Sequence, residues 1–399
     1  MTDKVQAGVT WWHRGTDGSP RAGAASVLHS DSQRWYLFGG LDTVYTSTLL
    51  SFDLTDQLWS EVEVLPDVEY DKPCARAYAR AVLIEDTLYL YGGIANGFRF
   101  LSDVWRVCLS FENEPRWQCL CPHGPEFARL ADFSMVLFDD RLVVFGGLGP
   151  GYSFSTELLA FDLKTFHWCV LPQVGHGPSG RRGQACVRVG SYMIVYGGMS
   201  YVDQKHVTHD ELHALSLVPM RNALGEESFI WGRMAVDGDP RPPALSGAKL
   251  VSHGSNLYMY GGGVNKTTLD VLWRLQLREG LSSWSVVCMD PSKEAPLGRV
   301  NHHLVVVKRG DAHDGDLLVL FGGQLEDETD AGDMWMISLS DTVQACSSVL
   351  ASLSSSCASS SASHSDLSST STSGVHSSYG SSSSSGGGGS SSATAAGDG

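Results

Sequence analysis

Short apolar runs alternate with short polar stretches along the whole chain, and one arrangement of them recurs six times. In each copy an apolar run ends in an aromatic residue followed by two glycines. The six copies are Phe38-Gly39-Gly40, Tyr91-Gly92-Gly93, Phe145-Gly146-Gly147, Tyr196-Gly197-Gly198, Tyr260-Gly261-Gly262 and Phe321-Gly322-Gly323. Successive copies are 53, 54, 51, 64 and 61 residues apart, and periods near 50 residues are typical of repeats that each form one small sheet.

Each of the first five repeats contains four apolar runs. In the second repeat they read RAVLIED, TLYLYGG, LSDVWRVCL and RWQCLCP, with polar or Gly/Pro residues between them that suit turns. Four short strands per repeat form the blade of a β-propeller. The pattern therefore predicts an all-β, six-bladed β-propeller.

The glycines and large aromatic residues predict how the blades pack. Glycine tolerates positive φ and close approach of a neighbouring backbone at a strand end. The aromatic residue before each pair and a tryptophan in each fourth strand are predicted to pack between sheets. These tryptophans are Trp59, Trp117, Trp168, Trp231 and Trp284.

The sixth repeat lacks its fourth strand. After the last glycine pair the chain supplies one strand, predicted at about 332–340, and no further tryptophan. Residues 7–13 (AGVTWWH) precede the first repeat as a fourth strand would, so Trp11 or Trp12 is predicted to complete the last blade and close the ring. Closure would remove open sheet edges.

Two domains follow from this reading: a propeller at 7–340 and a tail at 341–399. The tail is rich in Ser and Gly, has no Lys or Arg and shows no apolar periodicity, so we predict that it is disordered and dispensable for folding. Phosphorylation of the tail and a simple spacer role both stay open.

The glycine pairs, the fourth-strand tryptophans and the arginine before each first strand resemble the Kelch repeat, over about residues 9–340. Two positions depart from the pattern: Leu245 stands near the place of the arginine in repeat five, and repeat six lacks its tryptophan. The resemblance implies a fold but leaves the function open, because Kelch propellers include enzymes, cytoskeletal binders and ubiquitin-ligase receptors.

Charge and composition narrow the partners. The net charge of −16 argues against nucleic acid and anionic membranes, which require dense basic surfaces. No run of about 20 apolar residues is present, and the first residues lack the apolar segment of a signal peptide. We expect a soluble monomer in the cytoplasm, with the nucleus as the alternative. The nine scattered cysteines are expected to be buried free thiols.

The candidate partner-binding residues form two groups. In the Kelch arrangement, arginines at the start of the innermost strands would ring the channel on one face, and the loops after the glycine pairs would open on the same face. The arginines are Arg21, Arg76, Arg129, Arg181 or its neighbour Arg182, and Arg299; the loop residues are Phe98, Phe100, Tyr152, Phe154 and Tyr201. Arginine forks bind carboxylates and aromatic residues anchor interfaces. The alternative role of the arginines is to bond loop carbonyls.

Catalysis has little support. His302 and His303 begin an inner strand, and His209, Glu211 and His213 alternate along one face, which is a weak metal pattern. No nucleophile elbow or phosphate loop is present. We therefore predict no catalytic residue, no metal and no cofactor.

The sequence favours a non-enzymatic protein-interaction module, acting as an adaptor or as the substrate receptor of a cullin-type ubiquitin ligase. A scaffold for cytoskeletal or vesicle-trafficking components is the alternative within this class. An enzyme or small-ligand binder with a site at the channel mouth is the alternative outside it.

Overall fold

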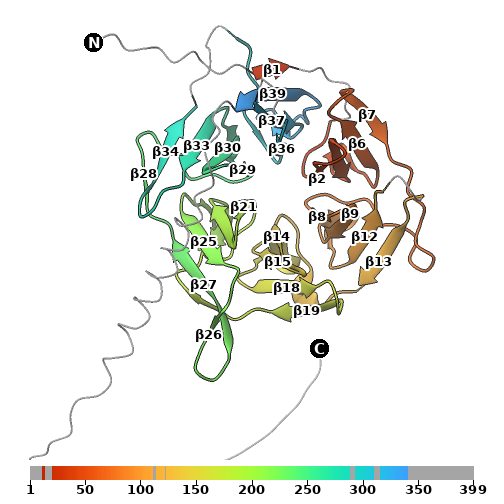
Figure 1. Cartoon of the computed structure of the whole chain (residues 1–399), viewed down its shortest axis with the longest axis horizontal. Coiled ribbons are helices and arrows are strands. Elements are labelled where there is room, and N and C mark those ends of the chain that lie inside the picture. Colours follow the sequence, from red (N-terminus) through yellow and green to blue (C-terminus); the bar gives the residue numbers. More distant parts are fainter. Residues whose placement is uncertain are drawn as a thin grey trace, which may run out of the picture.

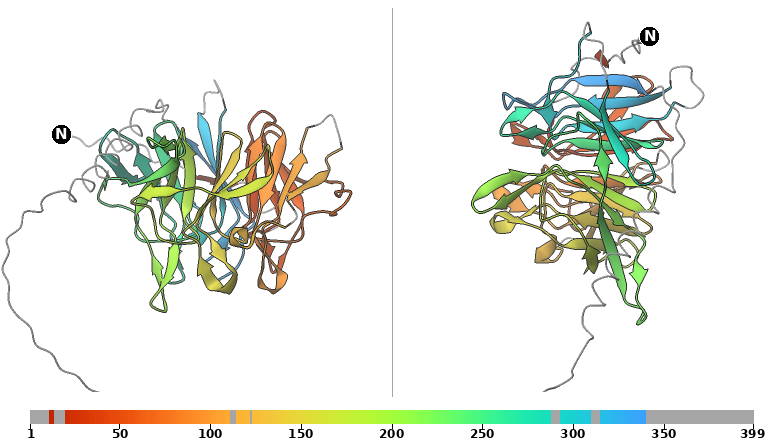
Figure 2. Two further views of the ribbon diagram at one scale, coloured as in Figure 1. Left: turned by 90° about the horizontal axis from the view of Figure 1, so that it is seen from below. Right: turned by 90° about the vertical axis from the view of Figure 1, so that its left-hand side faces the viewer.

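The computed structural model describes residues 11–13, 20–110, 114–121, 123–287, 293–309 and 315–339. Six sheets are arranged radially around one central axis, and seen from the side they form a thick disc (Figures 1 and 2). The prediction of a six-bladed β-propeller is confirmed.

The blades share one topology, in which each strand pairs antiparallel with its sequence neighbour from the channel to the rim. Blade 1 contains β2 (Ala25–His29), β3 (Arg34–Phe38), β6 (Leu49–Asp53) and β7 (Leu58–Glu61). Blade 2 contains β8 (Arg80–Ile84), β9 (Thr87–Tyr91), β12 (Val104–Cys108) and β13 (Trp117–Cys121). Blade 3 contains β14 (Ser134–Phe138), β15 (Arg141–Phe145), β18 (Leu158–Asp162) and β19 (His167–Val170).

Blades 4 and 5 each carry an additional outer strand, which runs parallel to the fourth strand. Blade 4 contains β21 (Ala185–Val189), β22 (Tyr192–Tyr196), β25 (Leu212–Ser216) and β27 (Glu227–Arg233), with β20 (Gln173–Gly175) outside and β26 (Met220–Arg221) in a protruding hairpin (Figure 1). Blade 5 contains β29 (Lys249–His253), β30 (Asn256–Tyr260), β33 (Leu272–Gln276) and β34 (Ser282–Val286), with β28 (Val236–Asp237) outside.

Blade 6 joins the two ends of the described propeller. It contains β36 (His303–Val307), β37 (Asp316–Phe321), β39 (Met334–Leu339) and, from the other end of the chain, β1 (Trp11–His13). Trp11 lies opposite Ile337, which is the register that the other fourth-strand tryptophans have with their third strands. Trp11 is buried, whereas Trp12 is 44% exposed. The predicted ring closure is confirmed, with Trp11 as the packed residue.

Short elements lie on the face of the glycine pairs, which we call the Gly-pair face. They are β4 (Leu41–Asp42) with β5 (Val44–Tyr45), β10 (Ile94–Ala95) with β11 (Arg99–Phe100), β16 (Leu148–Gly149) with β17 (Ser153–Phe154), β23 (Met199–Val202) with β24 (Lys205–Thr208), β31 (Gly263–Val264) with β32 (Thr267–Thr268), β35 (Arg299–Val300) with β38 (Gln324–Leu325), and the 3₁₀ turns η1 (Asn96–Phe98), η2 (Glu126–Ala128) and η3 (Pro150–Tyr152).

Aromatic rings join neighbouring blades as predicted. The aromatic residue before each glycine pair packs on the fourth-strand tryptophan of the following blade, with ring centroids 4.6–5.7 Å apart at all six interfaces. Trp11 against Tyr260 and Phe321 against Trp59 complete the circle. Such edge and tilted pairs add to the apolar area that the blades bury.

The glycine pairs also join the blades through the backbone. In every blade the second glycine donates its amide to a carbonyl of the following blade, at 2.7–2.9 Å. We call the accepting residues the lead residues: Arg76, Leu130, Arg181, Leu245, Arg299 and Arg21, for blades 2 to 6 and 1. A Cβ on each first glycine would lie within 2.8 Å of the same carbonyl oxygen, so only glycine fits there.

A second circle of hydrogen bonds surrounds the channel. One residue of each blade has a left-handed conformation, with φ between 55° and 77°, and donates its amide to the carbonyl of the corresponding residue in the preceding blade at 2.7–3.1 Å. The members are Gly23, Tyr78, Asp132, Gly183, Gly247 and Asn301. Three of them are not glycine. For such residues the left-handed conformation costs about 1–3 kcal/mol each, and it persists only where the surrounding structure enforces it. The closed circle supplies that constraint.

Candidate functional site

The four lead arginines point into their own blades. Arg21, Arg76, Arg181 and Arg299 are at most 5% exposed, and each donates to the carbonyl of the first glycine of its blade, at 2.9–3.1 Å. These contacts match the alternative role stated above, bonding of loop carbonyls. They leave the guanidinium groups enclosed by intrachain partners, whereas partner binding requires a free donor.

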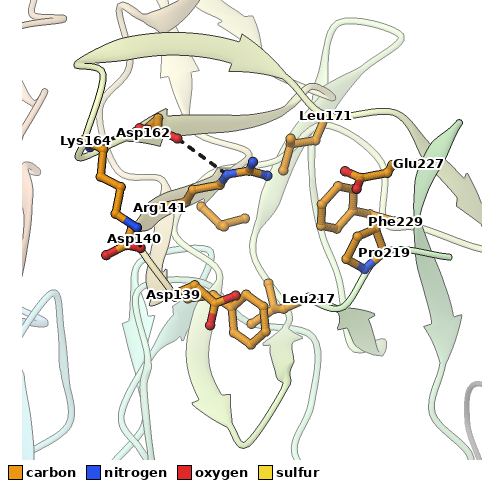
Figure 3. Close-up of a pocket in the computed structure, with 12 residues that line it drawn as sticks. Asp139, Asp140, Arg141, Asp162, Lys164, Leu171, Leu217, Pro219, Glu227 and Phe229 are labelled. Carbon is orange, nitrogen blue, oxygen red and sulfur yellow. Dashed lines mark hydrogen bonds and ion pairs between the residues drawn. The ribbon is translucent and has the colours of Figure 1, made fainter. Parts of the chain in front are cut away.

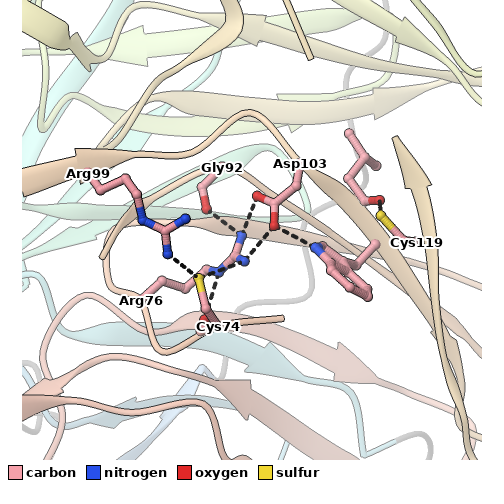
Figure 4. Close-up of polar contacts among 8 residues, drawn as sticks. Cys74, Arg76, Gly92, Arg99, Asp103 and Cys119 are labelled. Atoms are coloured by element: carbon pink, nitrogen blue, oxygen red, sulfur yellow. Dashed lines mark hydrogen bonds and ion pairs between the residues drawn. The ribbon is translucent and has the colours of Figure 1, made fainter. Parts of the chain in front are cut away.

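Three of the four lead arginines, Arg76, Arg181 and Arg299, also pair with an acidic residue of their own blade, and we call these pairs clamps. Arg76 contacts both carboxylate oxygens of Asp103 at 2.6 and 2.7 Å, and Trp105 donates to the same carboxylate (Figure 4). Asp333 is held in the same way by Arg299. Burial opposes ionisation of Asp333, but the hydrogen bonds and charge of Arg299 outweigh it, so the pKa of this carboxyl is lowered.

Arg129 differs from the other predicted arginines. The bridge between Ala131 and Leu148 corresponds to the bridge between Ala77 and Ile94, so the lead residue of blade 3 is Leu130. Placing Arg129 in the repeated arginine position is therefore corrected by one residue. Its side chain is exposed beside the loops of the Gly-pair face.

Two of these loops present aromatic rings in the same way. In η1 and η3 a left-handed glycine is followed by a left-handed aromatic residue: Phe98 with φ 56° and Tyr152 with φ 62°. Phe98 is 84% and Tyr152 50% exposed. Bulky residues rarely adopt this conformation, and such outliers gather at functional sites.

Tyr152 is the centre of an aromatic cluster. Its ring lies 5.7 Å from Phe154, 5.9 Å from Tyr201 and 6.2 Å from His206, all in edge-on arrangements. Tyr201 is 45% exposed and Phe154 is half-buried. The structure thus brings three of the predicted site residues together.

Two pockets lie on either side of this cluster. The first mouth pocket, of about 690 Å³, is lined by residues that include Phe98, Arg99, Phe100, Arg129, Asp132 and Tyr152. The second mouth pocket, of about 570 Å³, is lined by Tyr152, His206, Asn265, Lys266, Gln324 and Glu328 among others. Tyr152 and Arg182 line both, so the pockets adjoin at these two side chains.

Sequence reasoning missed several lining residues. Arg182 was left as an alternative to Arg181, and the structure buries Arg181 and places Arg182 between the pockets. Asp132 and Tyr78 line the first mouth pocket because they belong to the circle of hydrogen bonds around the channel, and no local sequence pattern predicts that circle. A usable signal for Arg99 was present, because GFRF and GYSF align in loops of equal length.

Asp132 organises the channel side of the first mouth pocket. It is buried and accepts from Arg80 at 3.3 Å and Arg182 at 3.4 Å. Burial, reinforced by the charge of Asp132, raises the pKa of Tyr78 to about 12, so this phenol keeps its proton at neutral pH.

A third hollow lies on the opposite face, between blades 3 and 4 (Figure 3). It has a volume of about 320 Å³ and contains none of the predicted site residues. Its two basic residues are paired within the hollow: Arg141 lies 3.9 Å from Asp162, and Lys164 lies 2.5 Å from Asp140. Exposed ion pairs of this kind contribute little to stability.

The weak metal pattern forms an ion-pair cluster. Glu211 lies 3.3 Å from Arg181 and 3.4 Å from His209, and His213 bonds the carbonyl of His176. Among the described residues no group of three or more His, Cys, Asp or Glu is arranged to hold a metal.

The cysteines only partly follow expectation. The six cysteines within the described ranges are free. Cys108 and Cys169 are exposed, so the expectation of burial is wrong for these two, and the other four are half-buried. In the part of the chain that the structure describes, no helix is long and apolar enough to span a bilayer.

Several curated proteins resemble this chain. Acyl-CoA-binding domain-containing protein 5 of Arabidopsis thaliana is 28% identical over 249 residues, covering 61% of this chain and 36% of that protein. Kelch domain-containing protein 10 of Rattus norvegicus is 23% identical over 284 residues, covering 67% and 63%. Host cell factor homolog hcf-1 of Caenorhabditis elegans is 24% identical over 267 residues, covering 61% and 34%. The chain thus spans under two thirds of the length of these relatives.

Comparison with solved structures supports the fold. The structure of YjhT has a TM-score of 0.59 and 18% identity, and the match covers 82% of this chain and 97% of that one. Residues 36–262, more than half of the chain, match the model of the KLHDC2/KLHL20/DRC7 Kelch-repeats domain. With the glycine pairs, tryptophans and ring closure described above, this match shows that the chain belongs to the Kelch-repeat β-propeller family.

Proposed function

We propose that this propeller is a non-enzymatic interaction module that binds a segment of a partner protein across the two mouth pockets. Kelch propellers typically act as protein-interaction scaffolds, which supports this class. The observation that carries the proposal is the exposed cluster around Tyr152, held by a left-handed turn between two adjoining pockets. Exposed aromatic residues at the centre of a concave surface are typical interface anchors.

The charges of the first mouth pocket indicate the chemistry of the partner segment. Arg99, Arg129 and Arg182 line the pocket, and Asp132 is its one carboxylate among the described lining residues. Asp132 is already engaged by Arg80 and Arg182. Arg99 and Arg129 therefore favour a segment that carries a carboxylate next to an apolar side chain.

The biological setting has two candidates. A substrate-recruiting adaptor, such as a receptor of a cullin-type ligase, requires one partner on this face and a second contact elsewhere. A cytoskeletal or vesicle-trafficking scaffold requires only stable binding. The free cysteines within the described ranges fit a reducing compartment, which supports a cytoplasmic or nuclear location.

Affinity purification from cell lysate with matched variants tests the proposal. We compare the unmodified protein, a Phe98→Ala/Tyr152→Ala variant, and a Leu58→Ala variant on the opposite face, where Leu58 is 66% exposed. Proteins that bind the mouth should be recovered with the first and third and lost with the second, after thermal melts confirm that all three are folded.

The identity of the recovered proteins separates the settings. Cullin adaptors select the receptor hypothesis, and actin-associated proteins or small GTPases select the scaffold hypothesis. Partners that survive the double substitution and are lost with opposite-face substitutions would place the binding surface elsewhere.

A further inference from the structure

The interior of the channel is a separate site from the mouth pockets. A cavity of about 160 Å³ lies among the six innermost strands, and every blade contributes to its lining. The polar lining residues are Ser26, Arg80, Ser134, Gln184, Cys186, Lys249, His302 and His303. A cavity of this size admits a small molecule or ion and excludes a folded peptide segment.

The lining carries cations without a matching carboxylate. Arg80 and Lys249 come from blades 2 and 5, and no Asp or Glu lines the cavity. The nearest acid, Asp132, is shared by Arg80 and Arg182. Lys249 forms no ion pair within the described ranges, so the interior of an acidic protein is locally basic.

These surroundings destabilise the charged form of the Lys249 side chain. Burial and, to a smaller extent, the charge of Arg80 lower its pKa to about 7, against the opposing effects of Asp132 and Cys186. An anion beside Lys249 would raise this pKa again, because it would pair with the ammonium charge and replace the hydration lost by burial.

Two buried imidazoles lack partners at the same place. His303 is 2% exposed and its Nε2 has no hydrogen-bond partner; His302 is 0% exposed and neither ring nitrogen has one. Buried polar groups are bonded in the large majority of cases, so unpartnered groups in a basic cavity are informative.

We propose that the channel interior is a binding site for a small oxyanion, held by Arg80, Lys249 and His303. A guanidinium, an ammonium and an imidazole N–H supply charge-assisted hydrogen bonds from three blades, which is a donor set suited to phosphate, sulfate or a small carboxylate. The site needs no partner protein, because the strand carrying each donor belongs to the propeller core.

The test is thermal unfolding of the full chain in Tris-chloride, titrated with sodium phosphate at ionic strength held constant with sodium chloride. The unmodified protein should show a saturable rise in Tm. Lys249→Met should lose the saturable part and keep only the small, unsaturated effect that phosphate has on most proteins. The matched control is Lys308→Met, since Lys308 is exposed just after β36, and it should behave like the unmodified protein.

A second readout uses the anion-free protein. Removing an unpaired, partly buried ammonium should raise Tm, so Lys249→Met should melt above the unmodified protein in chloride, and the order should reverse or the gap close in phosphate. Sulfate and acetate titrations then show which oxyanion binds best.

Superimposable phosphate titrations of the unmodified protein and Lys249→Met would overturn the proposal. Isothermal titration calorimetry of the unmodified protein with phosphate decides the question even if Lys249→Met does not fold. A one-to-one saturable heat supports the site, and the absence of such a heat with phosphate, sulfate and acetate, each at millimolar concentration, refutes it.

Discussion

The lead arginines and the aromatic residues of the mouth pockets differ in burial, in backbone conformation and in how many blades contain them, although both groups lie at the Gly-pair ends of the blades. Arg299 is 0% exposed, with its donors shared between Gly322 and Asp333, and it recurs in four blades. Phe98 and Tyr152 are exposed, strained and present in only two loops. In a repeat protein the recurring residue serves each repeat, so the residues that break the repetition are the better candidates for recognition.

Blade 5 shows how far the recurring clamp can change. Its lead residue is Leu245, and Val271 stands where blade 6 has Asp333; both pack in the same apolar cluster. Trp273 consequently has an unpartnered indole N–H, whereas Trp335 donates to Asp333. The backbone bond from Gly198 to Leu245 is kept. The carbonyl of the lead residue is thus invariant in role, and its side chain is replaceable.

The largest expected effect tests the buried side of the comparison. Arg299→Ala leaves the half-buried Asp333 without its cation and should lower the free energy of unfolding by about 3–5 kcal/mol. Arg129→Ala should change it by less than about 0.5 kcal/mol. Urea unfolding followed by tryptophan fluorescence measures both.

A double substitution sharpens this result. Arg299→Leu/Asp333→Val copies blade 5 and should recover most of the stability that Arg299→Ala loses, because replacing a buried ion pair by apolar residues is often neutral. Equal stability of Arg299→Ala and the unmodified protein would show that the pair of Arg299 and Asp333 does not stabilise the fold.

Ring closure predicts a contrast between neighbours in one strand. Trp11→Ala should cost about 3–5 kcal/mol, since Trp11 is 5% exposed and packs on Tyr260. Trp12→Ala should cost far less. Calorimetric melts of the two variants provide the measurement, and similar Tm values for both would contradict closure by Trp11.

The exposed side of the comparison predicts an effect on binding alone. Once a partner is purified, Tyr152→Ala should weaken binding by about 2 kcal/mol or more, a loss of roughly thirtyfold, with Tm unchanged. Leu58→Ala serves as the folded control. A Tm that falls in step with affinity would mean that Tyr152 acts through the fold.

The smallest expected effect concerns acid. Burial and the charges of Lys249, Arg299, Arg80 and Arg21 hold the pKa of His302 and of His303 well below 6.5, so the folded protein keeps them neutral. Below about pH 6.5 the unfolded chain takes up protons that the folded chain does not, and stability is lost as pH falls.

Melts at pH 7.5, 6 and 5 should therefore show a declining Tm. Burial also lowers the pKa of His213 to about 4, and this group adds to the decline. His303→Phe should flatten the profile and the exposed His206→Asn should leave it unchanged. A profile identical in all three proteins would exclude the channel histidines as the cause.

The sequence by itself determined the repeat, the strands and the N-terminal segment that closes the ring. Each Gly-Gly pair and the aromatic residue before it contact the following blade in the same way, so recurrence in the sequence translates directly into six equivalent contacts. Closure by Trp11 or Trp12 was predictable because repeat six lacks its tryptophan, and the structure selected Trp11.

Only the tertiary structure decided which polar residues are free. Arg181 and Arg182 are adjacent and chemically identical, yet one is enclosed by its blade and the other lies between the pockets, since successive residues at a strand point to opposite sides. Arg129 lies one residue before the lead position of blade 3, which is occupied by Leu130. The channel cavity depends on six strands from distant segments, and its unpaired Lys249 becomes visible only when those strands meet around one axis.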